Sequence, residues 1–119
     1  MQVSKRKVNS ALEKQIMAML CQLVVDTKNA DEARLIVGSL LSDTELTAIT
    51  KRLAVAYWLK KGRSYENIKE NLKVSSATIA ALQQELKKTG WKLAMQKVMA
   101  EEWATQIESK IKTLFKKKA

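Results

Sequence analysis

Polar and basic side chains gather between Gly62 and Gly90. Serine, threonine and glutamine side chains hydrogen-bond to base edges, alanines contact thymine methyl groups, and lysine or arginine side chains neutralise phosphates. This mixture in one short segment indicates a surface for nucleic acid. The candidate contact residues are Arg63, Lys69, Lys73, Ser75, Ser76, Ala77, Thr78, Ala80, Ala81, Gln83, Gln84, Lys87 and Lys88.

Few other residues offer chemistry. The chain has no histidine, so it holds no Ser-His or Cys-His pair and no histidine/cysteine metal cluster, and Cys21 has no intrachain disulfide partner. Adjacent carboxylates such as Glu101 and Glu102 point apart on a helix and form no acid–base pair. We therefore expect no enzyme activity, no metal ion and no cofactor. A lone unpaired cysteine fits the reducing cytoplasm.

Composition narrows the fold class and the kind of partner. The chain has 119 residues, one domain's length, and its 22 Lys+Arg against 12 Asp+Glu give a net charge of +10, which favours a polyanionic partner. No proline, three glycines and many helix-forming residues predict an all-α fold. The longest apolar run, residues 16–25, is interrupted by Gln22 and is too short to span a bilayer.

The elements that precede the polar segment start with a basic arm, residues 1–10. Ser10 is the expected cap of a first helix, whose apolar residues recur at helical spacing until residues 26–29. Either Asp31 or Asn29 is expected to cap a second helix. The N-terminal part of the chain therefore predicts two amphipathic helices.

A third helix is predicted from the capping box at residues 42–45 to Lys61, with Gly62 beyond its end. It is apolar on more than one face, and a chain of this size has few places to bury such a helix. We therefore expect an oligomer whose core is built from both chains. The apolar residues concerned are Leu46, Ile49, Leu53, Val55, Ala56, Tyr57, Trp58 and Leu59.

Residues 64–88 have the pattern of a helix-turn-helix. Ser64 caps a short helix, a tight connection at residues 73–74 follows, and Ser75 caps a second helix. Lys73 stands where such turns often use glycine, so we expect a left-handed conformation there, at a cost of roughly 1 kcal/mol. A small core fixes the helices at a steep angle and projects the start of the second helix into a major groove; it comprises Ile68, Leu72, Val74, Ile79 and Leu82.

Three runs of residues resemble the Trp operon repressor superfamily and its Trp-repressor-like (YerC/YecD) branch. These are residues 41–46 (LSDTEL), residues 51–62 (KRLAVA through LKKG) and residues 64–79 (SYENIKENLKVSSATI). The resemblance covers roughly residues 12–88. It implies a Trp-repressor-like helical bundle at residues 11–88 that contains the helix-turn-helix and forms an intertwined homodimer, with DNA as its partner.

The resemblance also implies where a corepressor would bind. In the Trp repressor the motif Ala-Thr-Ile, which matches residues 77–79, is followed by Thr-Arg-Gly. The arginine helps to hold the corepressor carboxylate, and the glycine makes room for the indole. This chain has Ala81 and Leu82 there. The other pocket arginine and a pocket threonine match Arg52 and Ser42, which are vestigial cofactor-binding candidates. We expect no tryptophan corepressor.

Residues 91–119 predict an extra C-terminal helix with a basic tail. Its large apolar residues recur every four positions, a stripe that spirals around the helix and is typical of core or interface packing; the alternative is a membrane-surface helix. Together with Lys5–Lys7, the tail lysines provide candidate phosphate contacts. The stripe consists of Met95, Met99, Trp103, Ile107, Ile111 and Phe115, and the tail of Lys110, Lys112, Lys116, Lys117 and Lys118.

These patterns together predict a homodimeric, sequence-specific DNA-binding regulator of transcription in the cytoplasm. One alternative is a helical dimerisation or scaffold module, whose alanine-rich face is a buried interface. Another is a nonspecific nucleic-acid binder that uses its basic ends. Residues 64–88 carry a net charge of only +1, against +3 in residues 1–10 and +6 in residues 87–119. The charge therefore favours binding of nucleic acid, but it does not favour strong sequence reading by the helix-turn-helix.

Overall fold

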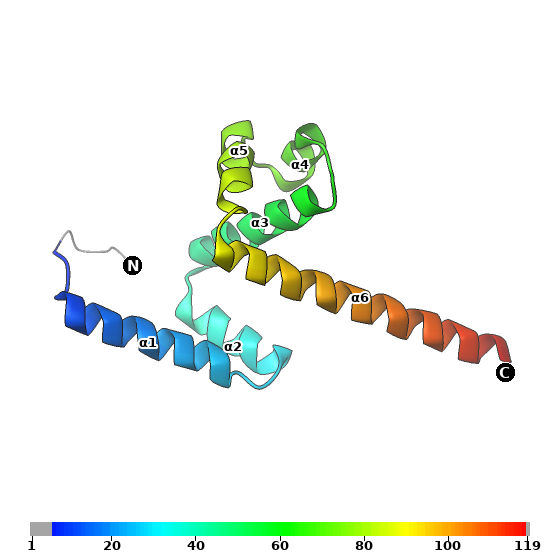
Figure 1. Ribbon diagram of the computed structural model, residues 1–119, viewed down its shortest axis with the longest axis horizontal. Coiled ribbons are helices and arrows are strands. Elements are labelled where there is room, and N and C mark those ends of the chain that lie inside the picture. Colours follow the sequence, from blue (N-terminus) through cyan, green and yellow to red (C-terminus); the bar gives the residue numbers. More distant parts are fainter. Residues whose placement is uncertain (1–5, 119) are drawn as a thin grey trace. The chain divides into compact units, whose positions relative to one another are not determined.

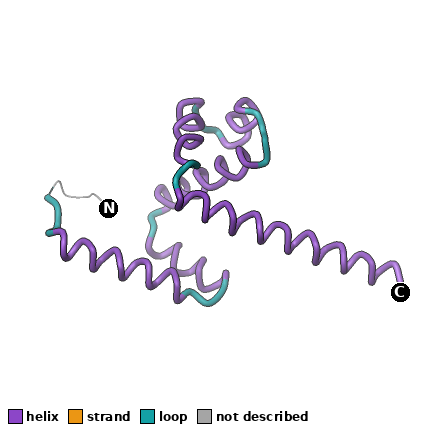
Figure 2. Tube along the Cα trace, in the orientation of Figure 1, coloured by secondary structure: helices purple, strands orange, loops and turns teal. Residues whose placement is uncertain are grey.

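The computed structural model describes residues 6–118, which form six α-helices joined by turns and short loops, without any strand in that range (Figure 2). This confirms the predicted all-α fold. The chain divides into two units, residues 1–48 and residues 49–119. The helices are α1 (Ser10–Asp26), α2 (Ala30–Leu40), α3 (Asp43–Lys60), α4 (Tyr65–Leu72), α5 (Ser76–Glu85) and α6 (Thr89–Lys118) (Figure 1).

Asparagine side chains cap the first two helices. The Oδ1 of Asn9 accepts a hydrogen bond from the backbone N–H three residues further on, at 2.9 Å. The prediction that Ser10 is the cap was wrong by one residue, because Asn9 has the extended backbone of a cap and Ser10 already lies in the first turn. Asn29 caps α2 through an equivalent bond of 2.9 Å, whereas Asp31 lies in the first turn.

The capping box predicted at the start of α3 is present. The Ser42 Oγ accepts a hydrogen bond from the Glu45 backbone N–H at 3.2 Å, and the Glu45 Oε1 accepts one from the Ser42 backbone N–H at 2.9 Å. The hydrogen bond from the Ser42 backbone N–H, and after it one with the Ser42 side chain, favours the ionised carboxylate and holds the pKa of Glu45 below its ordinary value. The entry into α3 is thus specified locally.

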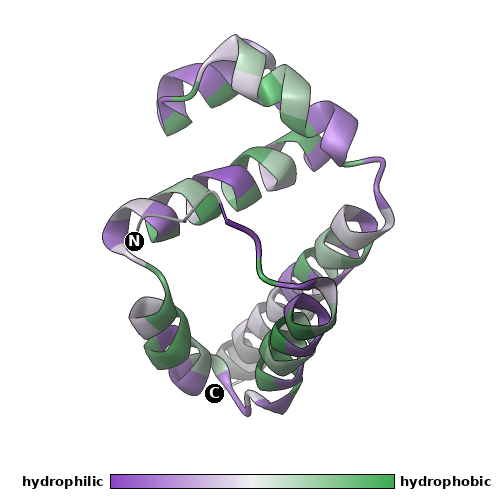
Figure 3. Ribbon diagram, turned by 90° about the vertical axis from the view of Figure 1, so that its left-hand side faces the viewer, coloured by the Kyte–Doolittle hydropathy of each residue, from purple (hydrophilic) through white to green (hydrophobic). Residues whose placement is uncertain are grey.

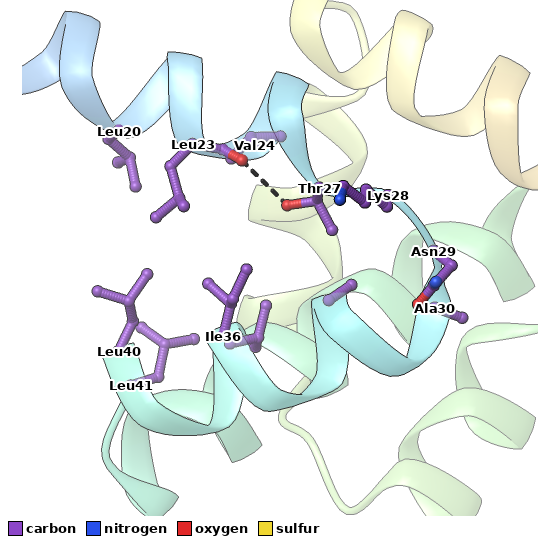
Figure 4. Close-up of a pocket in the computed structure, with 12 residues that line it drawn as sticks. Leu20, Leu23, Val24, Thr27, Lys28, Asn29, Ala30, Ile36, Leu40 and Leu41 are labelled. Atoms are coloured by element: carbon purple, nitrogen blue, oxygen red, sulfur yellow. Dashed lines mark hydrogen bonds between the residues drawn. The ribbon is translucent and has the colours of Figure 1, made fainter.

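The unit of residues 1–48 has an open apolar groove of about 520 Å³ between α1 and α2. Leu20 and Leu23 of α1 and Ile36 and Leu40 of α2 face one another across it (Figure 4). No residue of either helix is buried, and Leu20 and Leu40 are 45% and 56% exposed. Hydrophobic residues recur along the helices of the chain (Figure 3). In this unit they do not close a core.

The unit of residues 49–119 has a small hydrophobic core. Its α3 contribution comes from one face only, since Ile49 and Leu53 remain 47% and 41% exposed. The helix predicted to be apolar on several faces therefore buries just one of them within the chain. The core residues are Val55, Ala56, Ile68, Ile79, Leu82 and Met95, with Trp58, Leu59, Leu72, Val74, Leu86, Trp91 and Val98 packed against them.

Two residues of the described range have a positive φ, Gly62 at 79° and Lys73 at 55°. The left-handed conformation predicted for Lys73 is therefore confirmed. Its backbone N–H donates to the Lys69 carbonyl at 3.0 Å and closes the last turn of α4, after which the chain enters α5 within three residues. The sharp turn between the two helices depends on this residue.

Helix α6 starts before the predicted position, because Gly90 lies in its first turn and not in a connection. A glycine weakens a helix by about 1 kcal/mol, and burial of Met95 with partial burial of Trp91 on the core favours the early start. Further along, Trp103 is 66% exposed. Lys5 and the side chains of Ile107, Lys110, Ile111, Lys112, Phe115, Lys116, Lys117 and Lys118 lie outside the described part.

Candidate nucleic-acid interface

The helices α4 and α5 form the expected helix-turn-helix unit (Figure 1). α4 has 8 residues, α5 has 10, and only residues 73–75 separate them. Ile68 of α4 and Ile79 of α5 are fully buried, and Leu82 is 5% exposed. Leu72 and Val74 are partly buried against them, so all the predicted core positions come together. This packing fixes α5 on α4 and leaves its opposite face in solvent.

Helix α5 begins with a side-chain cap. The Ser75 Oγ accepts a hydrogen bond from the Thr78 backbone N–H at 3.1 Å and lies 2.9 Å from the Thr78 Oγ1. The remaining backbone N–H groups of the first turn have no helical partner and point out of the helix end. Such a terminus favours an anion, and a DNA phosphate is one. The hydroxyls of Ser75 and Thr78, which lie in contact with each other, are engaged in this cap.

The outward face of α5 is small and uncharged. Its side chains are all exposed, and none carries a formal charge: Ser76, Ala77, Ala80, Ala81 and Gln84. Alanine methyl groups contact thymine methyl groups, and serine hydroxyls bond to either donors or acceptors on base edges. A face of this kind permits close approach to a major groove, while it supplies no electrostatic attraction of its own.

The two glutamines predicted as readers have different partners. The Tyr65 hydroxyl, from α4, donates a hydrogen bond to the Gln83 Oε1. The Gln84 Oε1 accepts one from the Lys87 Nζ at 3.0 Å, on the exposed surface. Sequence reasoning did not single out Tyr65, which lies 18 residues from Gln83. Gln83 therefore takes part in the joint between the helices, and Gln84 belongs to the outward face.

Arg63 lies over an aromatic ring at the entry to α4. Its guanidinium carbon is 4.1 Å from the centre of the Trp58 ring, and its Nη1 donates to the Asn67 Oδ1 at 3.2 Å. A cation held over an indole keeps its charge and loses conformational freedom. The two contacts therefore favour one orientation of the exposed Arg63 side chain, which has further N–H donors. Neither Trp58 nor Asn67 was predicted to assist it.

The predicted lysines fall into two groups. Lys69 and Lys73, on α4 and the turn, are exposed and form no ion pair with a described residue. Lys88, after α5, pairs with Glu85 at 2.9 Å, and Lys87 donates to Gln84. An exposed ion pair of this type contributes little to stability, but it partly neutralises the lysine. The first group therefore presents the stronger free positive charge.

Comparison with known protein families settles the relationship of the chain. The family model described as Trp repressor protein matches residues 15–102, well over half of the chain. The chain belongs to the Trp repressor family. No curated protein matches it significantly. The Trp repressor family consists of DNA-binding transcription regulators and not of enzymes.

The positions linked with a corepressor in the Trp repressor family are changed or otherwise engaged. Leu82 is buried in the core where the family glycine would leave space, and the neighbouring Ala81 carries no charge. The Ser42 hydroxyl accepts the α3 capping bond, and Arg52 is exposed on α3. These residues give no support to an indole-sized cavity beside Leu82.

No three His, Cys, Asp or Glu side chains among the described residues are close enough together to hold a metal ion. None of the helices in the described range combines the length and the apolar character that crossing a membrane requires.

A polar cluster joins α3 to α6 at the end of the region that matches the Trp repressor family. The Lys61 Nζ is 3.1 Å from the Glu102 Oε1, and the Tyr57 hydroxyl also donates a hydrogen bond to Glu102. The bonds from Tyr57 and Lys61 hold the pKa of Glu102 below its ordinary value, and Glu102 raises the pKa of both partners. The cluster thus fastens α6 to the element that supports α4.

We expect this cluster to make folding stability depend on pH. Because the pKa of Glu102 is lower in the folded protein than its ordinary 4.5, the contribution of its ionised form is present above that value and is lost as the pH falls through the lowered pKa. Thermal unfolding from about pH 3 to about pH 7 measures it. Glu102→Gln should lower the midpoint most near neutral pH and least in acid. Glu101→Gln, an exposed neighbour, is the control, and identical profiles for the two variants would contradict the assignment.

Proposed function

We propose that the protein is a homodimer that binds DNA sequence-specifically through its helix-turn-helix and regulates transcription in the cytoplasm. The exposed, capped start of α5 on a helix fixed by Ile68, Ile79 and Leu82 is the observation that carries the proposal. A groove-reading helix needs a fixed base and a free N-terminal face. The family of the chain, which consists of DNA-binding regulators, supports the same function.

Base reading falls to the outward face of α5. Ala77, Ala80 and Ala81 are suited to contacts with thymine methyl groups, and the amide of Gln84 is suited to a hydrogen bond with a base edge. Lys69 and Lys73 lie on the preceding helix and turn, where a helix-turn-helix approaches the backbone, and provide phosphate contacts. Because the reading face is uncharged, most of the binding free energy is assigned to the cations around it.

The second copy in the proposed dimer covers the groove between α1 and α2. Soluble monomers seldom leave a large contiguous apolar patch in solvent. Here exposed apolar residues recur on both of these helices and also on α3, which a two-chain core explains. A two-fold dimer places its reader helices about 34 Å apart, one turn of DNA. The residues concerned are Leu12, Ile16, Met17, Met19, Leu20, Leu23, Val24, Val25, Val37, Leu40, Ile49 and Leu53.

The proposed regulator works without tryptophan. Two residues support this proposal. The buried side chain of Leu82 leaves no room for an indole, and the uncharged Ala81 cannot bind a carboxylate. Addition of tryptophan is therefore expected to leave DNA affinity unchanged. The proposal does not require any other effector.

Selection of bound sequences from a random DNA library tests the function. We expect enrichment of a two-fold symmetric motif and an affinity that falls steeply between about 50 and 200 mM salt. A steep salt dependence without an enriched motif would replace the proposal by nonspecific nucleic-acid binding. Absence of binding at about 50 mM salt would favour the scaffold alternative instead.

A matched pair of variants links the binding to α5. Ala80→Glu places a carboxylate on the proposed reading face and should weaken binding more than about tenfold, because it repels the phosphates and leaves a charge against the bases. Ala104→Glu makes the same change on the exposed surface of α6 and should have little effect. Equal effects of the two variants would show that α5 does not contact DNA.

A further inference from the structure

Tyr65 and Gln83 connect the two helices of the helix-turn-helix at positions far from the turn. Tyr65 is the first residue of α4, and Gln83 lies near the end of α5. The Tyr65 hydroxyl donates to the Gln83 Oε1, and the tyrosine as a whole is 38% exposed. We name this pair the Tyr65–Gln83 latch. It joins the start of α4 to the last turn of α5, whereas the turn at Lys73 joins the end of α4 to the start of α5.

The latch engages the amide of Gln83 in a hydrogen bond within the chain, at the protein surface. A glutamine that reads adenine uses its Oε1 and Nε2 together in a bidentate pair. Gln83 cannot keep its bond to Tyr65 and also turn its amide toward a groove. Gln84 is about 100° further round the helix, on the outward face, and has no bond to α4. The two neighbouring glutamines therefore have separate tasks.

We infer that Tyr65 and Gln83 are positioning residues that set the orientation of α5 for specific DNA binding, and that Gln83 does not read bases. This inference rests on the proposed function. The core between the helices is small, with Ile68 and Ile79 fully buried. A hydrogen bond beyond that core restricts the rocking of α5, so less freedom is lost on binding. Specific recognition needs this alignment, whereas nonspecific phosphate binding does not.

Tyr65→Phe tests the latch because it removes only the hydroxyl. The ratio of affinities for the selected motif and for random DNA should fall about three- to tenfold, the worth of one hydrogen bond, while affinity for random DNA stays constant. Amide hydrogen exchange in α5 of the free protein should become faster. Gln83→Met, which has no acceptor of comparable strength, should have the same effects, and the double variant should add nothing further.

Tyr57→Phe is the matched control, because it also removes a tyrosine hydroxyl bond, between α3 and α6. It should leave the affinity ratio unchanged. Loss of base preference in Gln83→Met but not in Tyr65→Phe would overturn the inference and make Gln83 a reader. Unchanged exchange and an unchanged ratio in Tyr65→Phe would also overturn it. If the wild type binds no DNA, the proposed function fails with the positioning role, and exchange alone decides whether the latch exists.

Discussion

A lysine in place of Leu20 is expected to convert the protein into a monomer and to abolish its tight binding to DNA. Leu20 faces the groove between α1 and α2 and is 45% exposed in the single chain. In the proposed dimer the second copy covers it. Each Leu20→Lys chain then lacks this apolar side chain and has to bury or displace an unpaired ammonium group. We expect the dimer dissociation constant to rise more than about a hundredfold, which corresponds to roughly 3 kcal/mol.

In the proposed dimer, DNA binding depends on the same interface. A monomer has one reader helix, so it cannot contact two half-sites in successive grooves. Sedimentation equilibrium measures the association, and titration of the selected motif measures the loss of DNA affinity. Both should change at the same protein concentration, because one interface controls them.

Leu35→Lys is the control for this prediction. It makes the same change in the same unit, at a residue of α2 that is 74% exposed and does not line the groove. We expect a dimer with near-normal DNA affinity. A dimeric Leu20→Lys protein would show that the groove is not the interface, and dissociation of both variants would extend the interface over the other face of α2.

The helix starts were the most predictable part of the fold, because their signals are local. Ser42 with Glu45, Ser64 and Ser75 form the caps that their spacing predicts. At α1 the prediction chose the wrong neighbour, since Asn9 and Ser10 are both good caps and only the backbone conformation distinguishes them. The local code located each of these starts to within about one residue.

The start of α6 was less predictable. Gly90 indicated a break, but it lies inside α6, because the contacts of Trp91 and Met95 with the core outweigh the weak helix propensity of one glycine. Those contacts come from α3, α4 and α5, and no local pattern contains them. Tertiary packing decided this boundary.

The candidate site was predictable by type and less so by contact. Residue types and core spacing indicated a helix-turn-helix before any contact was known. The pairs Tyr65–Gln83 and Trp58–Arg63 depend on how separate elements meet, since the first joins α4 to α5 and the second joins α3 to the loop before α4. A sequence pattern contains the period of each element and not the angle between two elements, so these partners had to come from the structure.

Lys69→Ala combined with Lys73→Ala is expected to weaken binding to every DNA sequence about equally. Both side chains are exposed and form no ion pair with a described residue, so each is available to a phosphate. The slope of log affinity against log salt should become shallower by about 1 for each lysine that is replaced, and hence by about 2 in the double variant. Lys97→Ala, an exposed lysine on α6, is the control and should leave the slope unchanged.

Gln84→Ala is expected to change base preference and not the general affinity for DNA. Its amide lies on the proposed reading face and accepts an exposed hydrogen bond of 3.0 Å from Lys87, which a base edge can replace. The variant should keep the salt slope and lose preference at one base pair per half-site, by roughly fivefold. Selection of bound sequences with each variant distinguishes the two roles. A Gln84→Ala protein that retains the full preference would place base reading on the alanines and serine of α5, whereas a changed motif in the lysine variant would mean that these lysines contact bases.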